Sequence, residues 1–371
     1  MYNTQYAGDT AVANAQSTTK PVTQNSELRT QNSRLPWRAA LVVLALAAVP
    51  FVLAAVSGQA VDGGNSKFWQ GVLIQVFILT VYAMSYNLLL GYTGILSFGH
   101  AMFYGSGAYT AAILLTHAGW GLPAVIGAVL VVALVQSVII GVLSLRVRGV
   151  YLAMVTLAFA QMFFILAEAT DFRQWTNAED GLHGVPVPDW LNATDHRLTF
   201  YFIALAFAVA VYAFIARVIG SPTGRVFIAI RENEARAQTV GYNTFRYKLL
   251  AVALSGVLAA LAGLLQTLWT TSANPGILSS GTTINALLMT IIGGVGTLAG
   301  PVIGAVVLQL LGYWLDQLFG PRWPLIFGLV YIAIVLFFPY GLAGTWQLRR
   351  AAWRHTWLTR VGRARAESPP T

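Results

Sequence analysis

The chain contains no cysteine and few charged residues, and each shortage excludes a class of protein. Without cysteine it can form neither a disulfide framework nor a thiolate nucleophile. Only 9% of the 371 residues are charged and 57% are hydrophobic, whereas soluble domains have about 25% charged residues. Because so little polar surface is available to cover a water-soluble globule, the composition indicates a polytopic membrane protein.

Motifs of common enzyme classes are missing as well. The chain has no Gly-x-x-x-x-Gly-Lys-[Ser/Thr] phosphate loop, no His-Glu-x-x-His helix and no Gly-x-Ser-x-Gly turn. Paired carboxylates do not occur within its apolar runs. We therefore predict that the chain is not an enzyme and holds no metal or cofactor, and that any ATP is bound and hydrolysed by another chain.

What the chain has in abundance is apolar sequence in runs of a length that spans a bilayer. A transmembrane helix needs about 20 such residues, so the runs predict an all-α fold of ten membrane helices. The eighth run is short and rich in glycine, which favours a broken or re-entrant helix. The ten runs are 37–56, 69–90, 95–116, 121–145, 150–169, 199–219, 249–270, 282–297, 301–319 and 324–341.

The basic residues, which give a net charge of +9, predict how the chain is oriented. Lys and Arg occur in short clusters between apolar runs and not in one basic domain, so we expect no nucleic-acid partner. If the chain begins in the cytoplasm, 18 of its 22 basic residues fall on the cytoplasmic side. Both termini are therefore predicted to be cytoplasmic.

Polar sequence flanks the membrane domain, which is predicted to extend over residues 37–345. Residues 1–36 are rich in Asn, Gln, Ser and Thr and predict a disordered cytoplasmic head, and residues 346–371 form a basic cytoplasmic tail. Two connections within the domain are long enough to carry a function. We call residues 171–198 the outer loop and residues 220–247 the inner loop.

The outer loop, "DFRQWTNAEDGLHGVPVPDWLNATDHRL", mixes Trp, Pro, Gly and Asp in a way typical of ordered turns. It is acidic, which fits two interpretations: a docking surface for an external partner, or a solvated cap over the helix ends. The inner loop includes "SPTGRVFIAIRENEARAQTVGYN". Its pattern predicts a Ser-Pro-Thr-Gly turn and a short charged helix that extends from Arg231 to a break at Gly241. An ordinary solvated connector is the alternative interpretation.

Small residues interrupt the apolar runs at two places, "GYTGILSFGHAMFYGSGA" and "GGVGTLAGPVIGA". In a membrane helix such residues allow neighbouring backbones to approach closely. The two stretches share Gly-x-x-Gly-x-Leu, which fits a weak internal repeat. The glycines predicted as packing positions are Gly91, Gly94, Gly105, Gly107, Gly296, Gly300 and Gly304.

Polar side chains accompany the first of these stretches. Asn87, Thr93, Ser97 and His100 are candidates to line a translocation path, because a polar substrate needs hydrogen-bonding partners in transit. A hydrogen-bonded packing residue is the more common state of a lone His near a membrane interface, so packing competes with a proton relay for His100.

Five stretches together resemble one transporter family: "NLLLGYTGILSFGHAMFYGSGAYTAA", "RGVYLAMVTLAFAQM", "EDGLHGVP", "SPTGRVFIAIRENEARAQTVGYN" and "IIGGVGTLAGPVIGA". They are similar to the LivM-type permease subunit of branched-chain amino acid ABC transporters, over roughly residues 70–344. The inner loop resembles the ATPase-coupling loop of such importers, with Arg236 in place of the second Ala of their Glu-Ala-Ala pattern. The residues that the resemblance assigns to coupling are Arg231, Glu232, Glu234, Ala235, Arg236 and Gly241.

The resemblance implies an importer for branched-chain or other hydrophobic amino acids in a bacterial or archaeal cytoplasmic (inner) membrane. Its implied partners, besides the lipid bilayer, are a second permease subunit, two cytoplasmic ATPase subunits that bind ATP, and an external substrate-binding protein. Urea or a short amide is the alternative cargo, because related urea permeases share much of the pattern. An ion-coupled secondary transporter is the rival class, but it needs ionisable residues at mid-membrane, and the span centres hold almost none.

Overall fold

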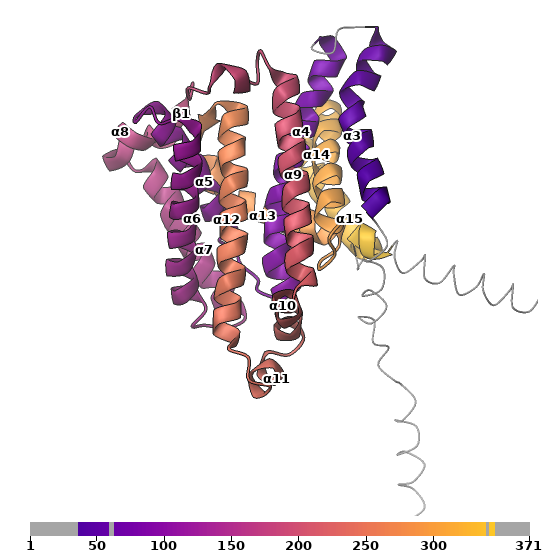
Figure 1. Cartoon of the computed structure of the whole chain (residues 1–371). Helices are drawn as coiled ribbons and strands as arrows, with labels where there is room; N and C mark the ends of the chain where they lie inside the picture. The colour runs from indigo at the N-terminus through magenta and orange to yellow at the C-terminus, as the bar shows by residue number, and fades with distance from the viewer. Residues whose placement is uncertain (1–35, 59–62, 339–340, 346–371) are drawn as a thin grey trace, which may run out of the picture. The chain divides into compact units, whose positions relative to one another are not determined.

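The computed structural model describes residues 36–58, 63–338 and 341–345, whose regular structure is almost entirely helical (Figure 1). By its contacts the chain divides into two compact units, Met1–Val49 and Pro50–Thr371. Of the first unit only the beginning of α3 (Pro36–Ser57) is described, and α3 continues into the second unit. The predicted head and tail lie outside the described residues, apart from Pro36.

The second unit contains all the other elements. Its helices are α4 (Gly64–Asn87), a π-helical turn (Leu88–Tyr92), α5 (His100–Thr116), α6 (Leu122–Ser144), α7 (Val150–Glu168), α8 (Arg173–Thr176), α9 (Arg197–Gly220), α10 (Pro222–Glu232), α11 (Glu234–Thr239), α12 (Thr244–Thr270), α13 (Ser280–Gly293), α14 (Gly300–Phe319) and α15 (Trp323–Phe337). Its 3-10 turns are Thr170–Phe172, Ala178–Asp180, Asp189–Leu191, Pro275–Leu278 and Gly320–Arg322, and its strands are β1 (Leu182–His183) and β2 (Ser272–Ala273).

Each of the ten predicted runs coincides with a helix, with boundaries that differ by up to five residues. Six stretches of the described residues are long and apolar enough to cross a membrane, and one of these, Gly300–Ile334, includes both α14 and most of α15. The all-α, polytopic class is therefore confirmed. The count of ten crossings and the cytoplasmic side of the termini stay predictions, because α5 and α13 have only 17 and 14 residues and α14 and α15 lie in one apolar stretch.

The core of the second unit is built around α4 and α12. Helix α12 packs against α5, α6 and α4, and small residues bring the backbones of α5 and α12 together. A Cβ atom added to Gly107 would lie 2.6 Å from the carbonyl carbon of Ala260, and one added to Gly263 would lie 2.8 Å from that of Tyr104. Such distances leave no room for a side chain, so these two contacts require glycine. Gly107 was among the predicted packing positions.

The two loops of the second unit lie at opposite ends of its helices. Figure 1 shows α8 and β1, which belong to the outer loop, at one end of α12, and α10 and α11, which belong to the inner loop, at the other. This arrangement agrees with loops on opposite sides of a membrane. Which end faces the cytoplasm stays a prediction.

The outer loop is joined to the end of α12 by a two-stranded antiparallel sheet. In the register of β1 and β2, Leu182 is opposite Ala273 and His183 is opposite Ser272. The backbone N–H of Val185 continues this pairing by donating to Thr271 O at 3.0 Å. The sequence did not predict these strands, because two residues per strand are too few for an alternating pattern to be visible.

Candidate functional site

The inner loop forms two helices where the sequence predicted one. Ser221 caps the start of α10 by accepting a hydrogen bond from Gly224 N at 3.3 Å, and Pro222 occupies its first position. The helix ends at Glu232, because Asn233 adopts an extended conformation and its side chain caps α11 by accepting from Arg236 N at 2.9 Å. The prediction of one helix from Arg231 to Gly241 was therefore wrong. Asn233 was the unrecognised signal, since Asn is a preferred helix cap.

An apolar cluster holds the two short helices together. The buried side chains of Val226 and Ile230 on α10 pack with Ala237 on α11, and Tyr247 on α12 packs against this cluster. This contact spans three helices, so α10 and α11 are fixed to each other and to the beginning of α12. A force applied to the loop would therefore act on the helices as a unit.

Glu234 reinforces this connection between α11 and α12. Its carboxylate lies 2.6 Å from Lys248 Nζ and accepts a hydrogen bond from Thr244 Oγ1 at 3.2 Å. Partial burial raises the pKa of the Glu234 carboxyl, but the hydrogen bond and charge of Lys248, helped by Thr244 and Arg148, outweigh burial and leave the pKa below its ordinary value. Glu234 is therefore ionised at neutral pH and is bound within its own chain.

The predicted coupling residues thus divide into two groups. Glu234 is bound within its own chain, to Thr244 and Lys248. Arg231 reaches away from the loop toward α4, where its guanidinium donates to Gly91 O. Of the six predicted coupling residues, Glu234 alone is partly buried; Arg231, Glu232, Ala235, Arg236 and Gly241 are exposed.

A group of polar contacts lies where α4 ends and α14 begins. The side-chain amide of Asn87 donates to Thr297 O at 2.9 Å and accepts from Gly296 N at 2.9 Å. Thr297 Oγ1 in turn donates to Gly294 O at 2.8 Å and accepts from Gly300 N at 3.0 Å. Together with the hydrogen bond from Arg231 to Gly91 O, these contacts join the two glycine-rich stretches. We call Asn87, Gly91, Arg231, Gly296 and Thr297 the inner cluster.

The two stretches that were predicted as a weak repeat therefore lie beside each other. A Cβ atom added to Gly91 would lie 2.7 Å from Gly296 N, and one added to Gly94 would lie 3.1 Å from Arg231 Cγ. The remaining predicted packing glycines also face other segments: Gly105 faces Leu278, Gly300 faces Gly293 and Gly304 faces Met289.

The four candidate path residues are buried in the packed interior of the chain. Asn87 is bound to the inner cluster, Thr93 Oγ1 donates to Leu89 O, and Ser97 Oγ accepts from Gly99 N at 3.2 Å. Each of the four is at most 4% exposed. Protein contacts therefore account for most of these polar atoms without a substrate, but the buried His100 Nδ1 has no hydrogen-bond partner among the described residues. The role of the four residues in a path stays a prediction.

His100 is the most enclosed of the four. Its Nε2 lies 2.8 Å from Ser85 Oγ, and its ring stacks on Tyr82 with 5.4 Å between ring centroids. Tyr86 and Phe103 meet the same ring edge to face. This aromatic enclosure fits the packing interpretation of His100.

Sequence reasoning missed three residues of this region. Thr244 and Lys248, which hold Glu234, were considered only as part of a loop and as a topology charge, and Thr297 was not singled out. The opposite charges of Glu234 and Lys248 on either side of the Gly241 turn were the available signal for the ion pair. Thr297 had no comparable signal, because its partners are far away in the sequence.

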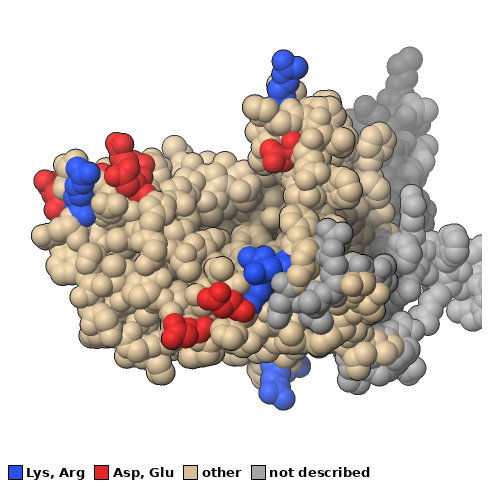
Figure 2. Space-filling model, turned by 90° about the horizontal axis from the view of Figure 1, so that it is seen from above, with Lys and Arg blue, Asp and Glu red and all other residues tan. Residues whose placement is uncertain are grey.

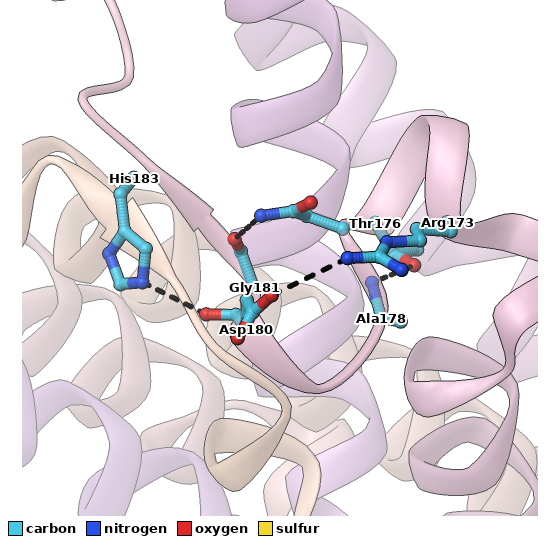
Figure 3. Close-up of polar contacts among 7 residues, drawn as sticks. Arg173, Thr176, Ala178, Asp180, Gly181 and His183 are labelled. Atoms are coloured by element: carbon cyan, nitrogen blue, oxygen red, sulfur yellow. Dashed lines mark hydrogen bonds and ion pairs between the residues drawn. The ribbon is translucent and has the colours of Figure 1, made fainter.

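Lys67 joins the outer loop to α4, because its Nζ donates to Thr194 O at 3.0 Å and its backbone oxygen accepts from Arg197 Nη1 at 3.1 Å. Residues 173–183 of the loop are linked to one another by local polar contacts (Figure 3). Arg173 Nη2 lies 3.9 Å from Asp180 Oδ2, and both side chains are largely exposed. His183 Nε2 lies 2.9 Å from the backbone oxygen of Asp180, and Asn177 Nδ2 donates to Gly181 O at 2.9 Å. Charged side chains at this end of the molecule stand in separated groups on a largely uncharged surface (Figure 2). Both interpretations of the loop, docking surface and cap, remain compatible with this arrangement.

Among the residues that the structure describes, no group of three or more His, Asp or Glu side chains is close enough to hold a metal ion.

Comparison with known proteins identifies one family. The model of the family described as "Branched-chain amino acid transport system / permease component" matches residues 69–339. LivM, a high-affinity branched-chain amino acid transport permease of Salmonella typhimurium, is 26% identical over 73% of the chain and 69% of its own length. The corresponding protein of Escherichia coli is also 26% identical, over 71% of the chain and 67% of its own length. A probable LivM of Methanocaldococcus jannaschii is 24% identical over 73% of the chain and 92% of its own length. No solved structure matches the chain.

Proposed function

Because the chain belongs to the family of permease components of branched-chain amino acid transport systems, we propose that it is a membrane permease subunit of an ABC importer. Its cargo would be a branched-chain or other hydrophobic amino acid. The observation that carries this proposal is the family match over residues 69–339, which covers most of α4 and all of the helices from α5 to α15. The relatives are transport permeases, and an enzymatic activity is not part of the proposal.

The proposed assembly contains a second permease subunit, two cytoplasmic ATPase subunits and an external substrate-binding protein. The chain has no phosphate loop, so the ATPase subunits would bind and hydrolyse ATP. The assembly would lie in the cytoplasmic membrane of a bacterium or archaeon, with the inner loop toward the ATPases and the outer loop toward the binding protein. This orientation is supported by the excess of basic residues at the end that carries the inner loop.

Helices α10 and α11 would transmit the movement of the ATPases. The exposed side chains of Glu232 and Arg236 would contact an ATPase groove, while Val226, Ile230 and Ala237 keep the two helices packed on the chain. Glu234 would act from inside, because its ion pair with Lys248 ties α11 to α12. Closure of the ATPase pair on ATP would then move the loop as a rigid body and switch access between the two membrane sides.

The proposal is tested by isolating the chain from gently solubilised native membranes and identifying the proteins that remain bound. We expect two ATPase chains and a second permease. The purified complex, placed in vesicles with its binding protein, should take up leucine only when ATP is supplied. Uptake of urea in place of leucine would support the alternative cargo. Isolation of the chain alone, with uptake that depends on an ion gradient and not on ATP, would contradict the proposal.

A further inference from the structure

We infer that Arg231 is a positioning residue that fastens α10 to the two glycine turns of the inner cluster. The inner ends of α4 and α14 would then move together with the inner loop. The consequence for transport rests on the proposed function, whereas the attachment itself follows from the contacts of Arg231 alone.

The first contact is between Arg231 and the end of α4. Its Nη1 donates to Gly91 O, across 140 residues of sequence. The π-helical turn at Leu88–Tyr92 makes this oxygen accessible, because the N–H groups of Gly94 and Ile95 bond to Leu90 and Leu89. Carbonyl groups at a helix end need partners from outside the helix. Arg231 is such a partner for Gly91 O, and its charged guanidinium makes a stronger hydrogen bond than a neutral donor would.

The second contact is with the turn that precedes α14. A Cβ atom added to Gly296 would lie 2.5 Å from Arg231 Nη1 and 2.9 Å from Gly91 O. The guanidinium therefore lies directly beside the backbone of this turn. Gly296 has φ of +77° and Gly94 has φ of +74°, a conformation that favours glycine, so both turns have the backbone shape that lets the arginine approach.

Asn87 completes the connection because it binds the two turns to each other. Its amide makes one hydrogen bond with Gly296 N and one with Thr297 O, both 2.9 Å long. A movement of α10 that displaces Arg231 would therefore displace both turns at once. The apolar packing of α10 gives the loop rigidity, and Arg231 gives it an attachment at the ends of two membrane helices.

The attachment is tested with Arg231→Gln and with the matched control Arg225→Gln. Both replace an exposed arginine of α10 by the same neutral side chain, but Arg225 lies at the other end of the helix. In the purified chain we expect backbone amides of residues 88–97 and 293–300 to exchange hydrogen about tenfold faster in Arg231→Gln than in Arg225→Gln, since one charge-assisted hydrogen bond is lost. Equal exchange in the two variants would overturn the attachment, whatever the protein transports.

The transport consequence is measured in the complete importer. Arg231→Gln should lower the amount of substrate moved per ATP hydrolysed about tenfold, with unchanged binding of the ATPase subunits. Arg231→Lys should recover part of this ratio, because lysine keeps a charged donor but lacks the planar fork of the guanidinium. A ratio equal to that of Arg225→Gln would overturn the inference, and so would loss of ATPase binding, which would place Arg231 in the docking surface. A wild-type protein without ATP-driven uptake would contradict the proposed function and leave the exchange result as the test of the attachment.

Discussion

The inner cluster and residues 173–183 of the outer loop are both made of turns, but their side-chain hydrogen bonds and ion pairs reach over very different distances along the chain. In the inner cluster, Asn87 binds Gly296 across 209 residues and Arg231 binds Gly91 across 140 residues. In the outer loop, His183 contacts a residue three positions away and Asn177 contacts one four positions away. The inner contacts are partly buried, whereas the side chains of Arg173 and Asp180 in the outer loop are 66% and 71% exposed.

This difference indicates two mechanical roles. A turn that is held by distant segments is displaced when any of them moves, so the inner cluster can pass a movement from one helix to another. A loop that is held by its own neighbours keeps its shape independently of the helices below it. Lys67 of α4 and the pairing of β1 with β2 join the outer loop to the helices. Within the loop, residues 173–183 are linked to one another by local polar contacts, so this segment resembles a preformed surface more than a moving part.

The largest expected effect is that of Gly296→Ala. The left-handed conformation costs a non-glycine residue roughly 1–2 kcal/mol, and the collision with Arg231 and Gly91 adds roughly 1–3 kcal/mol. We expect thermal unfolding in detergent at a clearly lower temperature. Gly127→Ala is the control, because a Cβ atom on Gly127 in α6 meets nothing within 4 Å. Equal unfolding temperatures for the two variants would show that the inner cluster is looser than its contacts indicate.

A smaller loss is expected for Asn87→Ala. The substitution leaves Gly296 N and Thr297 O without their present partners. Because both contacts are only partly buried, water can replace part of each, and the loss per group falls at the low end of roughly 1–3 kcal/mol. Hydrogen exchange should accelerate at residues 293–300, and the outer loop should be unaffected. Asn285→Ala on α13, where the asparagine is exposed, is the control for removing an amide from a membrane helix. Acceleration throughout the protein would mean that Asn87 supports the whole fold and not the local connection.

The sequence predicted the elements of this comparison better than their connections. The ten apolar runs and the glycines of the two repeat-like stretches could be located because hydrophobicity and small residues leave local patterns. The meeting of Arg231, Gly91 and Gly296 left none, since it depends on how α4, α10 and α14 pack. For the same reason Asn87 was predicted to line a path, although the structure shows it bound to a backbone turn. Polarity in an apolar run marks a special position but does not identify its partner.

Acidification should loosen the inner loop through Glu234. The pKa of the Glu234 carboxyl is lower in the folded protein than in the unfolded chain, where it has its ordinary value near 4.5. The ionised carboxylate therefore stabilises the folded protein at pH values above 4.5, and this stabilisation is lost as the pH falls through the folded pKa. Hydrogen exchange of residues 234–243, corrected for the intrinsic pH effect, should therefore increase below about pH 4.5. Glu234→Gln should remove this pH dependence, and Glu179→Gln in the outer loop should retain it. Persistence of the pH dependence in Glu234→Gln would assign it to another group.

The smallest effect is expected for Asp180→Ala in the outer loop. Its ion pair with Arg173 is long, at 3.9 Å, and both partners are exposed, so water and salt screen the attraction. Exposed pairs of this kind contribute roughly 0–1 kcal/mol to stability. His183 contacts the backbone oxygen of Asp180, so this contact is available after the substitution. We therefore expect the unfolding temperature and the hydrogen exchange of β1 to stay near the wild-type values. A fall in unfolding temperature as large as that of Asn87→Ala would contradict the contrast between the two regions. It would show that an exposed local contact stabilises the protein as much as a partly buried contact between distant segments.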